Sequence, residues 1–384
     1  MVGKMQQSPP NRRYELDWLR VFAMFVIFLF HCARFFDSDD WHVKNMQSDA
    51  VISIFVLFSV QWIMPLFFIL SGISTYYSLS FRSAGAFVRS RFKRLVIPLV
   101  FGIFVLVPPQ VYIERVSHFQ FSGSYFQFYP HYLDGFYAFG GNFAWMGLHL
   151  WYLLILFVFS ILTLPLFIYL RRPGPQGFTS KATSRFNHRG LLFSLALPLA
   201  ILEIVLDPTG IGRRDFGGWS LFLYMIFFLY GYVLFPNRRI RETIEASRIL
   251  TLSCAIATTV VALICELTIG FPGYGNSAYF IGLTVLRAFI AWFWLLCIVG
   301  FGCRYFRFSN NFLRYANQAV LPFYILHQTI IVAICFYLIN WDINVYLKYL
   351  VIAGSSVAAI LLIYQLIIKQ LDVLRFLFGL KKKN

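Results

Sequence analysis

The segment WLRVFAMFVIFLFHCARFF, residues 18–36, decides the class of this protein. It is long enough to cross a lipid bilayer as a helix, which takes about 17 to 25 mainly apolar residues. Its position near the amino end is also typical of a secretory signal peptide. However, it lacks a small-residue cleavage site and carries Arg20 and His31 in its interior. We therefore interpret it as a retained membrane helix.

Apolar segments of similar length recur along the chain. Hydrophobic residues make up 59% of the 384 residues and charged residues only 13%, a balance that is unusual for a soluble domain. We predict an all-α membrane protein with a single bundle of about ten transmembrane helices. The predicted spans are residues 18–36, 51–76, 95–113, 145–170, 191–206, 219–235, 249–269, 279–302, 319–339 and 346–368.

Basic residues alternate between the connections and predict the topology. The first connection is acidic, whereas the next is rich in Lys and Arg, and this alternation continues to the basic carboxyl end. By the positive-inside rule the basic connections and both ends of the chain are cytoplasmic. This predicts a cytoplasmic tail at 1–17, a bundle at 18–368 and a basic cytoplasmic tail at 369–384. Since the net charge of +17 lies in these connections, we expect a membrane environment and no nucleic acid.

Cysteine and histidine spacing gives no sign of a metal site. The six cysteines lie within or at the ends of apolar runs without a CxxC pair, which is typical of packing residues rather than disulfides or metal ligands. The seven histidines are scattered, and no carboxylate cluster accompanies them. The outer connection 114–144 is long and aromatic. It is predicted either to fold over the bundle or to be a passive interfacial loop.

Ionisable residues inside predicted spans are candidates for function, because charge is costly in a membrane. Arg20 and His31 lie eleven positions apart, which puts them on nearly one helical face and about 16 Å apart along the axis. Asp17, one turn before Arg20, is expected to fix its rotamer. The topology puts His31 in the outer half, where an imidazole could take a proton from a hydroxyl group. The ionisable residues that we single out within the spans are Arg20, His31, Glu203, Glu266, Arg287 and His327.

Arg20 and His31 also have an ordinary structural interpretation. Arg20 could extend to the lipid headgroups, and His31 could make one interhelical hydrogen bond. A histidine that acts as a base needs a partner, for which Glu203, Glu266 and His149 are candidates. Which of these lies beside the first helix is open.

Three further patterns have both a functional and a structural interpretation. In FVRSRFKRLVIP, residues 87–98, Arg91 and Arg94 could bind phosphate through forked hydrogen bonds or be ordinary topological charge. Ser71 and Gly72 permit close helix approach. His327 follows Tyr324 by one turn, so their polar tips could join one network, although a satisfied core histidine is the alternative.

Together these motifs resemble the membrane-bound acyltransferase 3 family. Its signature is an Arg or Lys followed after ten residues by His, here Arg20 and His31, with an early cytoplasmic RxxR, here Arg91 and Arg94. Three further strings occur in the expected order and extend the resemblance over nearly the whole chain. They are Phe67-Phe68-x-x-Ser71-Gly72, His149-Leu150-Trp151-Tyr152 and ANQAVLPFYILHQ at 316–328.

The resemblance implies a membrane O-acyltransferase. Such an enzyme would move an acyl group, for example succinyl or acetyl, from cytoplasmic acyl-CoA to a hydroxyl group of a glycan across the cell inner membrane. It would need no permanently bound cofactor. His31 would be the general base or a transient acyl carrier, and we favour the base. The other implied residues are Arg20 along the donor path, Arg91, Arg94 and Lys93 at the CoA phosphates, and His149, Trp151, Glu203, His327 and Ser71 as substrate-binding or orienting residues.

Two competing interpretations remain at this stage. A transporter or flippase for a glycan or a lipid-linked precursor would also place polar groups inside the membrane. Against it, the sequence has no inverted repeat and no matching pair of interrupted helices. A membrane scaffold without catalytic activity would not need the spacing of Arg20 and His31 or the cytoplasmic Arg pair.

Overall fold

The computed structural model describes residues 12–172, 174, 183, 185–206, 217–270 and 277–381. The regular structure of these residues is helical, apart from one isolated β-bridge between Phe136 and Phe143. Eight helical segments are long and apolar enough to cross a membrane, or ten if each of two bent helix pairs is one span. The predicted all-α fold with about ten spans is confirmed.

Each observed segment overlaps a predicted span, although several are longer, such as the third, which runs from Ala84 to Ser117 where 95–113 was predicted. Two of them are bent pairs, α8 with α9 at 47° and α13 with α14 at 109°. In order they are α1 (Tyr14–Ala33), α2 (Ala50–Val60) with α3 (Ile63–Phe81), α4 (Ala84–Arg91) through α5 (Ile97–Phe101) to α6 (Val107–Ser117), α8 (Trp151–Leu162) with α9 (Leu164–Leu170), α11 (Arg189–Phe193) with α12 (Ala196–Leu206), α13 (Leu221–Val233) with α14 (Arg238–Ala246), α15 (Arg248–Ile269), α16 (Ala278–Tyr305), α17 (Asn311–Leu338) and α18 (Val345–Ile363).

Many helices begin at a polar residue whose side chain accepts a hydrogen bond from the first turn. Asp49 caps α2, and its Oδ1 accepts from the backbone N–H of Ile52 at 2.9 Å. Such caps satisfy backbone donors that would otherwise lack a partner at the helix start. The same arrangement is made by Ser83 at α4, Ser220 at α13, Ser277 at α16, Asn310 at α17 and Asn344 at α18.

The outer surface of the bundle is apolar, as contact with lipid requires. In α15 only Thr251 and Ala255 are buried, although the helix is as apolar as most of the other spans. In water such a surface would favour aggregation, whereas a bilayer solvates it. Large exposed side chains of this helix are Ile249, Leu250, Ile256, Val260, Val261, Ile264, Leu267 and Ile269.

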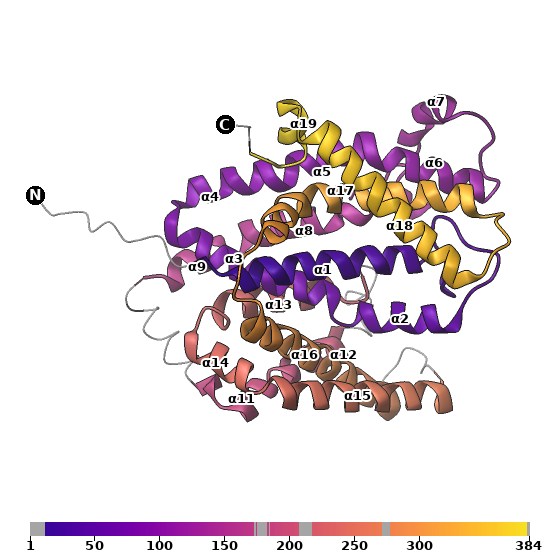
Figure 1. Ribbon diagram of the computed structural model, residues 1–384. Coiled ribbons are helices and arrows are strands. Elements are labelled where there is room, and N and C mark those ends of the chain that lie inside the picture. Colours follow the sequence, from indigo (N-terminus) through magenta and orange to yellow (C-terminus); the bar gives the residue numbers. More distant parts are fainter. Residues whose placement is uncertain are drawn as a thin grey trace, which may run out of the picture.

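Helix α1 lies in the middle of the bundle (Figure 1). It contacts α17 and α18 on one side and α2, α3 and α16 on the other. Nearby, α3 and α13 approach each other at two glycines. A Cβ on Gly72 would lie 2.1 Å from the backbone oxygen of Phe228, and one on Gly231 would lie 2.2 Å from that of Ile69. The predicted close approach at Gly72 is therefore confirmed, because only a hydrogen atom fits between the two backbones.

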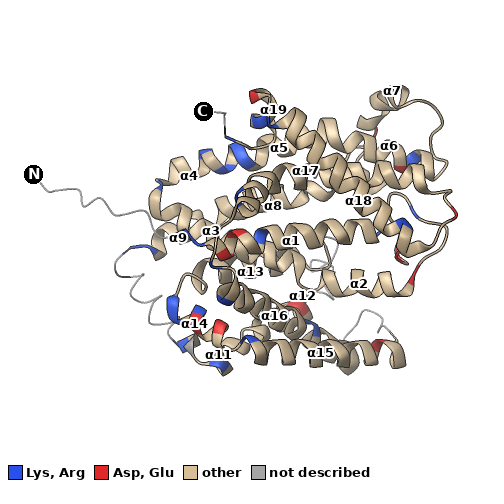
Figure 2. Ribbon diagram, viewed as in Figure 1, with Lys and Arg blue, Asp and Glu red and all other residues tan. Residues whose placement is uncertain are grey.

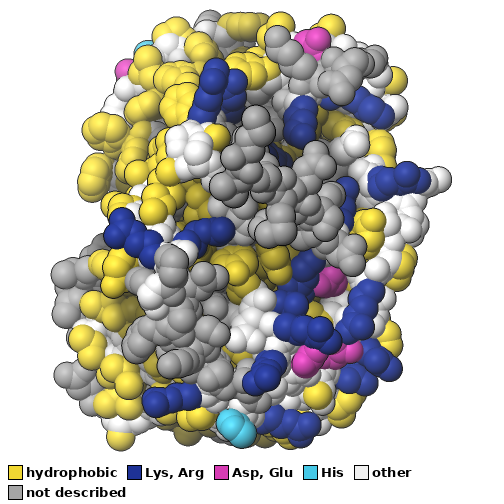
Figure 3. Space-filling view, turned by 90° about the vertical axis from the view of Figure 1, so that its left-hand side faces the viewer, with side chains coloured by type: hydrophobic (Ala, Val, Ile, Leu, Met, Phe, Trp, Pro, Cys, Tyr) yellow, Lys and Arg dark blue, Asp and Glu magenta, His cyan; other side chains and the backbone are white. Residues whose placement is uncertain are grey.

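Basic side chains gather at one end of the bundle, where α4 and α14 lie (Figures 2 and 3). The amino end of α1 and the short carboxyl-terminal helix α19 (Asp372–Leu377) lie toward the same end (Figure 1). We orient this end to the cytoplasm by the positive-inside rule. Helix α14 lies across it, with Ile240 and Ile244 buried and Arg238 and Arg239 exposed.

The connection between α6 and α8 is folded at the opposite end. It contains α7 (Tyr125–Phe128), whose start is a capping box formed by Ser124 and Gln127. Phe128 and Tyr132 of this connection are buried. We call residues 118–147 the outer segment. All six cysteines of the chain are free, and four of them, Cys32, Cys297, Cys303 and Cys335, are buried.

Candidate active site

Helix α1 presents Arg20 and His31 to two separate groups of polar side chains. Arg20 donates one hydrogen bond to Oδ1 of Asp17 at 2.7 Å and another to Oγ of Ser74 on α3 at 2.6 Å. The predicted fixing of Arg20 by Asp17 is therefore confirmed. Ser74 adds a link to the neighbouring helix, so the guanidinium is held from two sides.

Arg20 belongs to a basic cluster with Arg91 and Arg94. Arg91, the last residue of α4, donates to Oγ1 of Thr75 at 2.6 Å and lies over the ring of Phe87. Arg94 is exposed at the inner end, and its charge still interacts with that of Arg20. Lys93 is exposed beside it. Three guanidinium groups thus lie near one another, and the cluster has fewer acidic partners than cations. Such an excess of positive charge favours binding of a phosphate-bearing ligand.

A π-helical turn shapes this part of the chain. The turn covers Phe92–Val96 and is followed by Pro98, which has no backbone N–H to donate to the oxygen of Arg94. A wider turn accommodates the proline ring without breaking the span. Arg94 therefore lies in the distorted turn itself, so the simple helical spacing used for Arg91 and Arg94 does not describe their geometry.

Tyr152 lies between the basic cluster and the outer half of the bundle. Its hydroxyl oxygen lies 2.6 Å from Oγ of Ser71 and interacts electrostatically with Arg20 and Arg91. Its ring lies 6.1 Å from the ring of Tyr324, centroid to centroid. Ser71 is thus brought beside the basic cluster through Tyr152.

Three imidazoles from different elements form the second group, the imidazole cluster of His31, His149 and His327. The ring of His327 on α17 lies 5.0 Å from that of His31 and 5.0 Å from that of His149. His149 lies in a short 3-10 turn, Leu148–Leu150, that follows Gly147 with φ +80°. Tyr324 joins the cluster, since its hydroxyl donates to the backbone oxygen of His149.

Hydrogen bonds fix the tautomers of two of these rings. Nε2 of His149 lies 3.2 Å from the oxygen of Ile325, and Nδ1 of His327 lies 2.6 Å from the oxygen of Tyr324. A carbonyl oxygen only accepts, so each of these nitrogens carries the proton. The other nitrogens, Nδ1 of His149 and Nε2 of His327, then present lone pairs and have no hydrogen-bond partner among the described residues.

His31 is the least restrained ring of the three. Its Nδ1 is buried without a partner, and no hydrogen bond joins its ring to any described residue. Besides His327, it packs edge-on to Phe30 and lies 6.5 Å from the ring of Trp41. The ring is therefore held by packing, and its nitrogens remain available for a proton. The sequence suggested that the polar tips of Tyr324 and His327 could join one network. The structure shows no direct bond between the two tips, because the Tyr324 hydroxyl bonds with the backbone of His149 and the His327 ring with the backbone of Tyr324.

The structure places Trp151 and Glu203 outside both clusters. The ring of Trp151 packs against Phe68 and Tyr224. Glu203 on α12 is buried and forms an ion pair with Arg287 on α16 at 3.4 Å. Of the three partners considered for His31, only His149 lies in its cluster.

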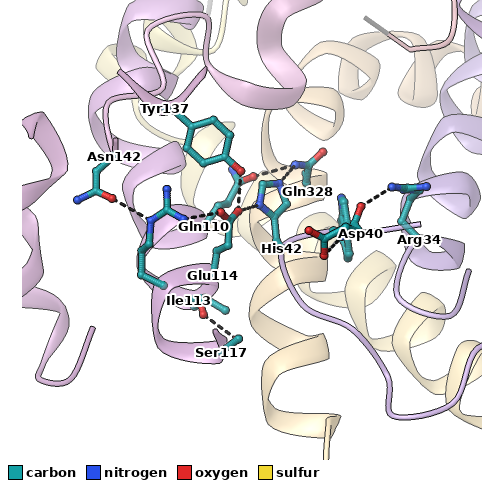
Figure 4. A network of polar contacts seen from close by, with 12 residues as sticks. Arg34, Asp40, His42, Gln110, Ile113, Glu114, Ser117, Tyr137, Asn142 and Gln328 are labelled. Atoms are coloured by element: carbon teal, nitrogen blue, oxygen red, sulfur yellow. Dashed lines mark hydrogen bonds and ion pairs between the residues drawn. The ribbon is translucent and has the colours of Figure 1, made fainter. Parts of the chain in front are cut away.

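A network around His42 was not singled out from the sequence (Figure 4). Nδ1 of His42 bonds with Oε2 of Glu114, and its Nε2 lies 2.9 Å from Nε2 of Gln328. Tyr137 of the outer segment donates to the same Glu114 oxygen at 2.7 Å. Burial raises the pKa of Tyr137, and the Glu114 charge adds to this, so the hydroxyl remains a donor. The sequence did hold one sign of this network, because Gln110 and Gln328 place polar amide groups inside membrane spans.

The loop that carries His42 is fixed by a buried carboxylate. Arg34 and Lys44 both bond with Asp37, with Lys44 Nζ 2.6 Å from Oδ1. Burial raises the pKa of Asp37, while the two cations act in the opposite direction. Within the described part of the chain, no group of three or more His, Cys, Asp or Glu side chains is arranged so that it could hold a metal ion.

Comparison with known proteins assigns the class. A family model described as an acyltransferase domain matches residues 13–365, and the chain belongs to this acyltransferase 3 family. It is therefore a multi-pass membrane O-acyltransferase by family.

Among curated proteins, the chain is similar to glucans biosynthesis protein C of Escherichia coli strain K12. The two are 24% identical over 387 residues, which cover 98% of this chain and 96% of the relative. The same identity and coverage hold for the protein of that name from strain SMS-3-5 and from strain E24377A of serotype O139:H28. No solved structure matches the chain.

Proposed function

We propose that this protein transfers an acyl group from acyl-CoA, bound at the cytoplasmic end, to a hydroxyl group of a glycan at the outer end. One observation carries the proposal. The same helix, α1, contributes Arg20 to the basic cluster and His31 to the imidazole cluster. Both ends of the transfer path then lie on one rigid helix, on which Arg20 and His31 are about 16 Å apart along the axis.

The donor end is supported by charge and exposure. Arg94 and Lys93 are exposed at the inner end, where the phosphates of CoA would first meet the protein. Arg91 and Arg20 lie deeper and are anchored by Thr75 and Ser74. Guanidinium groups recognise phosphate through paired hydrogen bonds, and Arg20 would face the donor arm between the phosphates and the thioester. Acyl-CoA is a substrate in this scheme and is released as free CoA.

At the outer end, His31 acts as general base. The acceptor oxygen attacks the thioester carbonyl carbon while its proton passes to His31. The carbon–sulfur bond then breaks, and the leaving thiolate takes up the proton held by His31, which gives free CoA and restores the neutral imidazole. His149 and His327 offer lone pairs that can accept hydrogen bonds from acceptor hydroxyl groups or from an N–H of His31.

The similarity to a glucans biosynthesis protein supports a glucan as the acceptor. Succinyl and acetyl are the acyl groups that we propose, and the inner membrane of the cell is the location. Trp151 and Glu203 remain candidates for acceptor binding, although both already have partners within the protein.

Mass spectrometry of envelope glycans from cells with and without the gene tests the function. We expect glycans that are heavier by one or more acyl groups only when the gene is present. A complemented strain that carries His31→Gln is the matched control and should yield unmodified glycans. Glycans of unchanged mass that accumulate in a different compartment would instead indicate a transporter and contradict the proposal.

A further inference from the structure

His42, Glu114 and Gln328 form a buried network of hydrogen bonds (Figure 4). His42 is 7% exposed and Gln328 3%. The Gln328 amide nitrogen lies 2.9 Å from Nε2 of His42 and 3.1 Å from Oε1 of Gln110. On its other side, His42 bonds through Nδ1 with Glu114. These hydrogen bonds therefore link the loop after α1 with α6 and α17.

The hydrogen-bond donors and acceptors around His42 indicate which of its ring nitrogens carries the proton. A carboxylate only accepts, so Nδ1 of His42 carries a proton toward Glu114. The amide nitrogen of Gln328 only donates, so Nε2 of His42 is the acceptor. His42 is thus a neutral imidazole with both nitrogens satisfied. A histidine paired with a glutamate resembles a general base, but here the lone pair that would take the proton is already bonded.

The two residues joined by this bond each have a chain neighbour in contact with His31. Trp41 precedes His42, and its ring lies 6.5 Å from that of His31. His327 precedes Gln328, and its ring lies 5.0 Å from that of His31. His31 itself has no hydrogen bond to a described residue, so its orientation depends on packing against these two rings and the ring of Phe30.

We propose that His42 is a positioning residue, whose hydrogen bond with Gln328 holds Trp41 and His327 against the ring of His31. The inference rests on the proposed role of His31 as the base. Glu114 fixes the tautomer of His42 and, through Tyr137, connects it to the outer segment. Misplacement of a catalytic group by about 1 Å can cost about 100-fold in rate. Loss of the His42–Gln328 bond should therefore lower kcat.

Two substitutions of His42 separate positioning from proton transfer. The amide of His42→Asn replaces Nδ1 and loses the bond with Gln328, whereas the amide of His42→Gln reaches the place of Nε2 and keeps it. Gln328→Met breaks the same bond from α17 with little change in volume. Each purified variant is assayed in proteoliposomes with acetyl-CoA and succinyl-CoA as donors and glycans extracted from cells lacking the gene as acceptors. The rate is expressed per folded molecule, measured by size exclusion.

We expect His42→Asn and Gln328→Met to lower kcat at least about tenfold, while the KM for the donor changes less than about twofold. His42→Gln should retain most of the kcat. Equal losses in His42→Gln and His42→Asn would mean that His42 itself takes the proton and would overturn the proposal. Unchanged kcat in His42→Asn and Gln328→Met would reduce the network to a structural role and would also overturn it.

The same assay separates this inference from the proposed function. His31→Gln is measured alongside, and full activity in that variant would remove the proposed base and the positioning role together. Loss of activity in His31→Gln with normal activity in Gln328→Met would contradict only the role of His42. Because Gln328→Met leaves His42 intact, it decides the question if the His42 variants do not fold.

Discussion

The imidazole rings of His31 and His327 lie 5.0 Å apart, although one comes from the first membrane-spanning segment and the other from the ninth. His149, from a third element, lies equally close to His327. Two of these rings present lone pairs fixed by backbone carbonyls, and the third has no hydrogen bond to a described residue. The three rings thus present unbonded ring nitrogens to one another, at the opposite end of α1 from the basic cluster.

Substitution of His31 should abolish acyl transfer without unfolding the bundle. The ring makes no hydrogen bond to a described residue, so His31→Gln removes little stabilisation, whereas loss of a general base costs about 100-fold or more in kcat. The measurement is acyl transfer in proteoliposomes, with thermal unfolding in detergent as the folding control. A wild-type rate in folded His31→Gln would rule out the catalytic role.

Removal of two guanidinium groups should weaken donor binding. In the double variant Arg91→Ala with Arg94→Ala we expect the KM for acyl-CoA to rise at least about tenfold, because charged hydrogen bonds to phosphate are lost. The dependence on acceptor concentration should change little. Arg89→Ala, at an exposed residue of α4, is the control for loss of a basic charge outside the basic cluster. If acyl-CoA affinity were equal in the double variant and the control, the Arg pair would be ordinary topological charge.

The close packing of α3 and α13 predicts a stability effect at Gly72. A Cβ there would lie 2.1 Å from a backbone oxygen, so Gly72→Ala must separate the two helices and lower the thermal unfolding temperature. Gly354→Ala on α18 is the matched control, because a Cβ added there would have no other atom within 4 Å and alanine favours a helix by about 1 kcal/mol. Equal unfolding temperatures for the two variants would contradict the observed packing.

The ion pair between Glu203 and Arg287 predicts that Glu203 stabilises the fold. Arg287→Met should destabilise the protein by about 3 kcal/mol or more, because it removes the cation from a buried carboxylate. The double variant Arg287→Met with Glu203→Gln should recover part of this loss. Thermal unfolding of the three variants measures both effects. If Glu203→Gln alone left stability unchanged but raised the KM for the acceptor, the residue would belong to the acceptor site instead.

The predicted partners of His31 show where sequence reasoning failed to decide. Glu203 and Glu266 were as acceptable as His149, because all three are ionisable and in apolar segments of the outer half. Glu203 proved to pair with Arg287, and Glu266 lies on α15, at the lipid-exposed edge of the bundle. Likewise, the spacing of Arg91 and Arg94 could not reveal that Arg94 lies in a π-helical turn, which depends on how Pro98 is accommodated.

The sequence by itself determined the membrane spans, their number and the family. Apolar length, the alternation of charge and the motif from Arg20 to His31 are all properties of neighbouring residues, so they are readable along one chain. Only the tertiary structure decided that His31 meets His327 and His149, and that His42 bonds with Gln328. Lipid solvates every apolar helix face alike, so the choice of neighbour depends on side-chain packing and buried hydrogen bonds between distant segments, which no local pattern records.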